Sequence, residues 1–131
     1  MNDIIPAKGI GEFTLDMTYD EVISRLRQKQ TAFTVEKLPR KIVTDELEFW
    51  ADDEGNITQI MAKGGFDGKL CGKIGIGSTL GDVRRLIAPY RYEEYVYEIE
   101  GMGGICLEPD DKCDGEDDDS SVISCISVYK E

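Results

Sequence analysis

The densest group of chemically active side chains in this 131-residue chain is a run of carboxylates at residues 109–119. Its acids are Asp110, Asp111, Asp114, Glu116, Asp117, Asp118 and Asp119. The common helix–loop–helix calcium loop needs an acid at its third position and Glu at its twelfth. Counted from Asp110, these positions hold Lys112 and Ser121, so that loop is excluded. We predict no metal site and interpret the run as a segment that binds a partner; a solvated loop or an irregular cation site are the alternatives.

Catalytic motifs are missing from the rest of the chain. It contains no histidine, which removes the usual general base near neutral pH and the commonest transition-metal ligand. The glycine-rich residues 72–79 suggest a phosphate loop, but such a loop needs Lys directly before Ser or Thr. Here Gly77 precedes Ser78, so a turn before a helix is the better interpretation. We therefore predict no catalytic residue, no cofactor and a protein that is not an enzyme.

The four cysteines show no paired spacing. Cys71, Cys106, Cys113 and Cys125 form no C-x-x-C motif, and free thiols are the expectation. Cys106 and Cys125 are expected on strands and could be neighbours, so a disulfide between them is the alternative.

Charge restricts the class of partner. The formal net charge is −12, and such a field repels nucleic acid and anionic membranes but attracts basic proteins. Solubility alone is the plainer interpretation of the same charge. No apolar run is long enough to span a bilayer. The first residues show neither the basic start nor the apolar core of a secretory signal, so we expect a cytoplasmic protein.

Aromatic residues are the second group of candidate partner contacts. Tyr95 and Tyr97 are expected on one face of a strand, and tyrosine is common at binding surfaces. Trp50 alternates with Leu47 and Phe49, so it faces an open side if those two residues face the helices. The alternatives are that the tyrosines are ordinary strand residues and that a loop buries Trp50.

An internal repeat indicates which elements position these side chains. Residues 11–22 align without gaps on residues 72–83. Each copy contains a capping box, Thr18 with Glu21 and Thr79 with Asp82, followed by apolar residues at helical spacing. We therefore predict helices at about 18–29 and 79–88.

Alternating apolar residues after each helix predict antiparallel strands. The expected strands are residues 31–37, 41–43, 47–51, 57–63, 92–100, 104–108 and 121–129, with a hinge at 64–68. A short strand or turn is expected at residues 9–15, before the first helix. Neither helix can bury its apolar stripe alone. We therefore predict a single α+β domain over residues 1–131, made of two tandem repeats at about 9–63 and 70–130. They would form one sheet with both helices on one face.

The repeated unit resembles a known family. Residues 15–22 and 76–83 are similar to the tandem helix-plus-sheet unit of the β-lactamase inhibitor protein and the SmpA/OmlA outer-membrane lipoproteins. The resemblance implies the fold above. Those relatives are exported, whereas this chain shows no signal and no lipid-bearing N-terminal Cys, so their targets are not carried over. In general type, the chain also looks like an immunity protein of contact-dependent or other polymorphic toxin systems, which implies one cognate toxin as partner.

These features lead to one main hypothesis and two alternatives. The main hypothesis is a cytosolic inhibitor, an immunity protein whose acids occlude the basic active-site cleft of a cognate toxin, with a nuclease as the expected kind of toxin. The first alternative is a small-ligand-binding domain or carboxylate-based enzyme that uses the open sheet face. The second is a subunit of a larger assembly, and the oligomeric state is left open.

Overall fold

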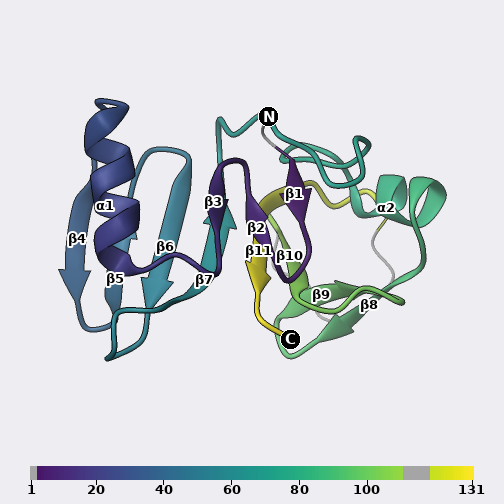
Figure 1. Ribbon diagram of the computed structural model, residues 1–131. Coiled ribbons are helices and arrows are strands. Elements are labelled where there is room, and N and C mark those ends of the chain that lie inside the picture. Colours follow the sequence, from purple (N-terminus) through teal and green to yellow (C-terminus); the bar gives the residue numbers. More distant parts are fainter. Residues whose placement is uncertain (1–2, 111–118) are drawn as a thin grey trace.

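The computed structural model describes residues 3–110 and 119–131, and it contains two helices (Figure 1). Helix α1 spans Tyr19–Gln28 and helix α2 spans Leu80–Leu86. Both begin with a complete capping box, in which a threonine hydroxyl accepts from a backbone N–H and an acidic side chain accepts from the threonine N–H. Both predicted helices are therefore confirmed, with ends slightly inside the expected ranges.

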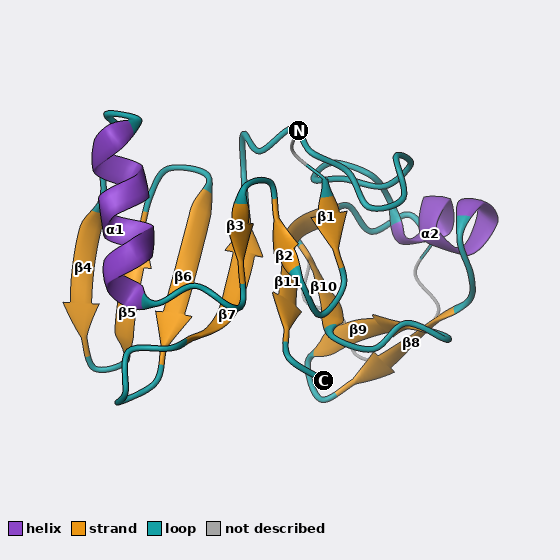
Figure 2. Ribbon diagram, viewed as in Figure 1, coloured by secondary structure: helices purple, strands orange, loops and turns teal. Residues whose placement is uncertain are grey.

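Eight strands form one antiparallel sheet, shown with the helices in Figure 2. The first half of the chain provides β4 (Thr34–Lys37), β5 (Arg40–Val43), β6 (Leu47–Ala51) and β7 (Ile57–Ala62). The second half provides β8 (Tyr90–Glu93), β9 (Val96–Ile99), β10 (Ile105–Pro109) and β11 (Ile123–Tyr129). The order is β4-β5-β6-β7-β11-β10-β9-β8, so the last strand of each half meets the other at the centre.

A second sheet corrects the single-sheet expectation, because the short strand or turn expected at residues 9–15 belongs to it. Strands β1 (Ile4–Ile5), β2 (Gly9–Ile10) and β3 (Phe13–Thr14) pair antiparallel and lie in front of the centre of the large sheet (Figure 1). Phe13 packs edge-on against Phe49 of β6, with ring centroids 4.9 Å apart. Two-residue strands are too short for alternation to reveal, and long-range packing of this kind holds them in place.

The two halves of the large sheet match strand by strand. Phe49 lies opposite Ile60 in one half, and Leu107 lies opposite Ile126 in the other. The register shifts at the end of β6, between Trp50 and Ala51, and likewise at the end of β10, between Glu108 and Pro109.

The helix starts are tied to the sheet in matching ways. Thr18 forms an antiparallel bridge with Asn56, just before β7, and Thr79 forms one with Val122, just before β11. In the central ladder Met61 lies opposite Ser127, with Ile60 opposite Val128 and Ala62 opposite Ile126. This ladder has the symmetry expected when two equivalent strands pair with each other.

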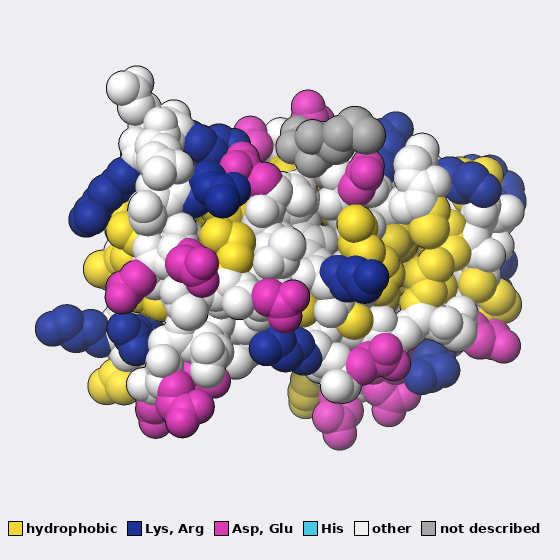
Figure 3. All heavy atoms as spheres, in the orientation of Figure 1, with side chains coloured by type: hydrophobic (Ala, Val, Ile, Leu, Met, Phe, Trp, Pro, Cys, Tyr) yellow, Lys and Arg dark blue, Asp and Glu magenta, His cyan; other side chains and the backbone are white. Residues whose placement is uncertain are grey.

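One face of the large sheet contributes to the hydrophobic core. Ile42, Phe49, Ile60 and Leu107 are completely buried there, in one cluster with the buried residues of both helices. The helices and the three-stranded sheet lie on this side, with α1 over β4–β6 and α2 near β8 (Figure 1). Acidic and basic side chains are interspersed on the outside of this layer (Figure 3). The described residues on the face shown in Figure 3 therefore present no broad patch of one charge.

The predicted strand over residues 92–100 is wrong, because the chain folds into a hairpin there. Strands β8 and β9 pair antiparallel, with Glu93 opposite Val96. Glu94 and Tyr95 form the turn with φ of 44° and 75°, the left-handed conformation that a type I′ hairpin turn needs at both central positions. The usual signal for such a turn is Asn-Gly or Asp-Gly, which this segment lacks.

Candidate functional site

Trp50 lies on the sheet face opposite the core. Its neighbours across the sheet are Lys41 on β5 and Gln59 on β7. Adjacent Phe49 is completely buried on the core side, so alternation places Trp50 on the other side, as predicted. The Lys41 ammonium nitrogen lies 5.0 Å from the centroid of the Trp50 ring, within the range of a cation–π contact. The indole therefore has a fixed cation against it.

A cluster of three charges holds that cation in place. Lys41 Nζ lies 3.1 Å from Glu48 Oε1, and Lys63 Nζ lies 2.8 Å from Glu48 Oε2. The side chains of Lys41, Glu48 and Lys63 are only 18%, 14% and 24% exposed. Such shielding makes the pairs stronger than ordinary surface pairs. The Lys41–Glu48–Lys63 cluster therefore orders the surroundings of Trp50.

The ion pairs shift the pKa values of Glu48 and Lys41. Burial alone would raise the pKa of Glu48, but hydrogen bonds from Lys63 and Lys41 outweigh it, and the pKa lies below its ordinary value. The hydrogen bond to Glu48 raises the pKa of Lys41. Glu48 and Lys41 are therefore both charged at neutral pH. Glu36 also lies 3.7 Å from Lys41, at the more exposed edge of the cluster.

The middle of this face is polar and contains two thiols. Gln59 Nε2 donates to Ser127 Oγ over 3.1 Å, and Ser127 is 1% exposed. Cys106 lies opposite Ser127, and Cys125 lies opposite Glu108 on the same pair of strands. The two cysteines are therefore diagonal neighbours, and both are free thiols, as expected.

Neither thiol is suited to nucleophilic chemistry. Burial, and then the charges of Glu108 and Glu98, raise the pKa of Cys106 to about 11. Burial also raises the pKa of Cys125. The thiolate is the reactive form, so both groups are unreactive at neutral pH. The third described cysteine, Cys71, is an exposed free thiol, and Cys113 lies outside the described residues.

The acidic run can be placed only at its two ends. Asp110 is exposed and donates its backbone N–H to Val122 over 2.8 Å. Asp119 is held more firmly, because its carboxylate accepts from Arg84 over 3.1 Å and from the Tyr90 hydroxyl. Asp119 therefore ties α2 and β8 together. The remaining acids, Asp111, Asp114, Glu116, Asp117 and Asp118, lie outside the described residues.

Trp50 and the acidic run are at opposite ends of the sheet. Strands β6 and β10 run in opposite directions, so the end of β6 and the start of β10 lie at the same edge of the sheet. Trp50 is near this edge, and Glu108, near the end of β10, is at the opposite edge. Three strand spacings and four residues along β11 separate the two positions, or about 20 Å in all. A single protein partner can span that distance, because a standard interface covers about 800 Å² on each side.

The two tyrosines do not share an open face. Tyr95 lies in the β8–β9 turn and is 86% exposed, whereas Tyr97 is 1% exposed. Tyr97 packs edge-on against Tyr90 and Tyr92, each with ring centroids 5.4 Å away. The expectation that Tyr97 lies on an accessible face is therefore wrong. The turn changes the alternation between Tyr95 and Tyr97, and Tyr97 points into the core.

The described part of the chain shows neither a metal site nor a membrane-spanning helix. Residues 3–110 and 119–131 contain no group of three or more His, Cys, Asp or Glu side chains arranged to hold a metal ion. None of the helices described here has the length and hydropathy needed to cross a bilayer. Comparisons with protein-family models, curated proteins and solved structures find no significant match. The case for function therefore depends on the geometry of this chain.

The sequence analysis missed the Lys41–Glu48–Lys63 cluster. Lys41 lies on β5, Glu48 lies on β6 and Lys63 directly follows β7, so Glu48 is 7 and 15 positions away from its partners in sequence. The only sequence signal was that polar residues alternate with core residues on all three strands. The pairing could be read only after the strand register was known.

Proposed function

We propose that the chain is a protein-binding inhibitor whose contact surface is the sheet face around Trp50. The observation that carries the proposal is an aromatic side chain held in place by Lys41, which is itself held by Glu48. Tryptophan, tyrosine and arginine are the residue types enriched among interface hot spots. An anchor that is already ordered loses little conformational entropy when it binds, which favours affinity.

The acidic character supports a basic protein as the partner. The net charge of −12 would increase the rate of encounter with such a partner, and the acidic run lies within reach of an interface that contains Trp50. A basic toxin that acts on nucleic acid has the complementary charge at its active site. We propose that the chain occludes such a site, as immunity proteins do, within the cytoplasm of the cell that makes the toxin.

Matching features of the two halves of the large sheet support the proposal of a tandem helix-plus-sheet repeat. The matching registers, the two equivalent register shifts and the paired bridges at Thr18 and Thr79 are those expected of one unit used twice. We infer two tandem units that share the large sheet, with the three-stranded sheet added at the centre. A wide sheet of this kind provides a broad surface for a protein partner.

A binding experiment with the adjacent gene product tests the proposal. The protein encoded next to this chain is expressed alone and with it, and growth of the host is measured. We expect toxicity alone and protection when the two are co-expressed. With purified proteins, Trp50→Ala should weaken binding about 30-fold, which corresponds to the loss of about 2 kcal/mol typical of a hot spot. Leu38→Ala is the matched control, because Leu38 is 96% exposed beside β4.

The acidic run is tested separately through the association rate. Asp117 and Asp118 are changed to Ser, while Asp119 is kept because it contacts Arg84 and Tyr90. We expect slower association at low salt and little difference at high salt. Failure of the chain to protect or to bind the neighbouring product would contradict the proposed function. Unchanged affinity of the Trp50→Ala variant would move the contact away from this face.

A further inference from the structure

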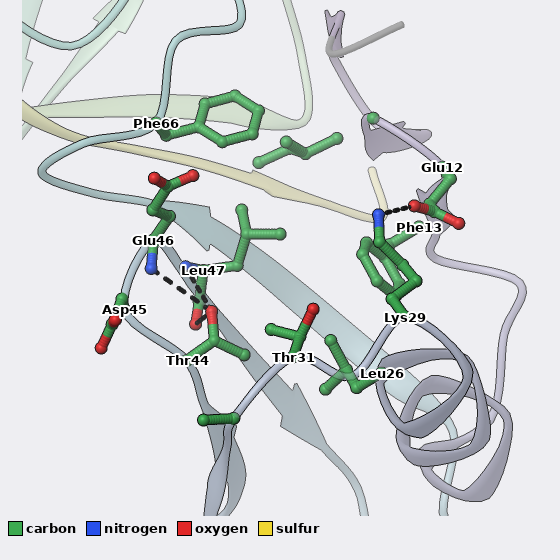
Figure 4. Close-up of a pocket in the computed structure, with 13 residues that line it drawn as sticks. Glu12, Phe13, Leu26, Lys29, Thr31, Thr44, Asp45, Glu46, Leu47 and Phe66 are labelled. Carbon is green, nitrogen blue, oxygen red and sulfur yellow. Dashed lines mark hydrogen bonds and ion pairs between the residues drawn. The ribbon is translucent and has the colours of Figure 1, made fainter.

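A pocket of about 340 Å³ lies on the helix side of the sheet, away from Trp50 (Figure 4). It opens between the C-terminal end of α1 and the turn that joins β5 to β6. Leu26, Leu47 and Phe66 provide apolar walls, and Figure 4 shows Leu47 and Thr31 pointing toward the hollow between them. The volume is near the lower end of the range for small-molecule sites.

The turn on one side of the pocket is fixed by a threonine. Thr44 is 7% exposed, and its hydroxyl accepts from the backbone N–H of Leu47 over 2.9 Å and of Glu46 over 3.3 Å. The same hydroxyl donates to the Leu47 carbonyl over 3.0 Å. These bonds hold the backbone of Glu46 at the mouth of the pocket. In Figure 4 the Glu46 carboxylate is directed toward Phe66, whereas Asp45 points away from the pocket.

The charged side chains around the pocket differ in whether they form ion pairs within the described residues. Lys29 is paired with Glu12, and Arg25 Nη1 also lies 3.0 Å from the Glu12 carboxylate. The Glu46 carboxylate forms no ion pair or side-chain hydrogen bond within residues 3–110 and 119–131. The charge left without a partner at this pocket is therefore negative. A ligand that carries a cation complements it.

The fold itself does not require the opening, because the equivalent place in the second half is filled. The strand register assigns an equivalent in the second half to each residue at this place in the first half. Tyr97 is the equivalent of Ile42, Ile99 that of Thr44, and Ile105 that of Leu47. There Tyr97 and Ile99 are buried, and the rings of Tyr90 and Tyr92 pack against Tyr97. The first half has a threonine and an open space where the second half has larger apolar side chains.

We propose that this pocket binds a small organic monocation. The apolar body of the ligand lies against Leu26, Leu47 and Phe66, and its ammonium group lies beside the Glu46 carboxylate. A neutral ligand of the same shape loses the charge-assisted hydrogen bond, and an anionic one is repelled. The choice of a free amine rather than a side chain of a protein partner rests on the proposed function, which places the protein partner on the opposite side of the sheet, around Trp50.

Three matched probes test the proposal on the full chain without any partner. Phenethylamine, 2-phenylethanol and 3-phenylpropionate share a ring and a two-carbon linker but differ in charge. Binding is followed by the NMR shifts of the Leu26 and Leu47 methyl groups. We expect saturable shifts with the amine, at least threefold weaker binding of the alcohol and no binding of the acid.

Two variants and one control assign the contacts. Glu46→Gln should weaken amine binding about tenfold, while Glu54→Gln, an exposed acid in the β6–β7 turn, should leave it unchanged. Thr31→Phe should abolish binding by filling the pocket, and its far-UV CD spectrum should match that of the wild type.

Two results would overturn the proposal. One is equal binding of all three probes, or amine binding that does not depend on Glu46. The other is the absence of methyl shifts at 10 mM amine, including the case in which the same methyl groups respond only to a protein partner. Both are independent of the toxin experiment, so this proposal and the proposed function can fail separately.

Discussion

Glu48 is the residue on which the sheet face around Trp50 depends. Glu48→Gln leaves Lys41 and Lys63 close together and largely shielded from water, with no carboxylate between them. We expect a loss of about 1 to 3 kcal/mol in the free energy of unfolding at pH 7, measured by urea denaturation. Glu36→Gln is the control, because Glu36 is 52% exposed and 3.7 Å from Lys41, and its loss should cost no more than about 0.5 kcal/mol.

The same variant has a predictable pH dependence. The pKa of Glu48 is lower in the folded protein than its ordinary value, so its ion pairs contribute full stability above the unfolded pKa. That contribution is lost as the pH falls through the folded pKa. The difference between wild type and Glu48→Gln should be constant from pH 6 to 8 and shrink below about pH 4. If the stability difference between wild type and Glu48→Gln persisted in acid, its cause would be something other than the charge of Glu48.

At the scale of elements, the β8–β9 hairpin is built on an unfavourable turn. Glu94 and Tyr95 both have positive φ, which costs about 1 kcal/mol or more for each residue that carries a Cβ. Replacing them together by Asn and Gly should stabilise the protein by about 1 to 2 kcal/mol, seen as a higher urea midpoint with an unchanged slope. Little packing is lost, because Tyr95 is 86% exposed.

A control separates turn conformation from side-chain removal. The Glu94→Asn, Tyr95→Ala double variant removes the same tyrosine ring without providing glycine, and its gain should be clearly smaller. Equal midpoints for the two double variants would show that backbone conformation at this turn is not the source. If Tyr95 also contacts a partner, both variants will lose affinity whatever their stability.

For the whole molecule, the central β7–β11 ladder predicts a single unfolding transition. Residues of both halves belong to one buried cluster, so neither half can open without exposing apolar surface of the other. Trp50 is the only tryptophan, and its fluorescence reports on the first half. A Trp50→Phe, Tyr92→Trp variant reports on the second. In each protein the fluorescence and far-UV CD curves should coincide in urea. A fluorescence transition that precedes the CD transition in either protein would mean that the halves unfold separately.

The sequence by itself determined the local elements of this protein. The capping boxes at Thr18 and Thr79 and the apolar stripes behind them predicted both helices, because hydrogen bonds and contacts within a few residues stabilise these features. Alternation predicted β6 and β7 and the side on which Trp50 lies. The α+β class followed from the need to bury both helices against strands.

Only the tertiary structure decided how these elements meet. The sheet order, the three-stranded sheet, the Lys41–Glu48–Lys63 cluster and the pocket beside Glu46 all depend on contacts between distant parts of the chain. Alternation assigns neighbouring residues to opposite faces, but it does not say which strand lies beside which or in what register. Tyr97 shows what alternation cannot predict. The turn at Glu94 and Tyr95 lacks the usual Asn-Gly or Asp-Gly signal, and it places the Tyr97 ring in the core. The chemistry of this protein depends on register, and register is set by packing across the whole sheet.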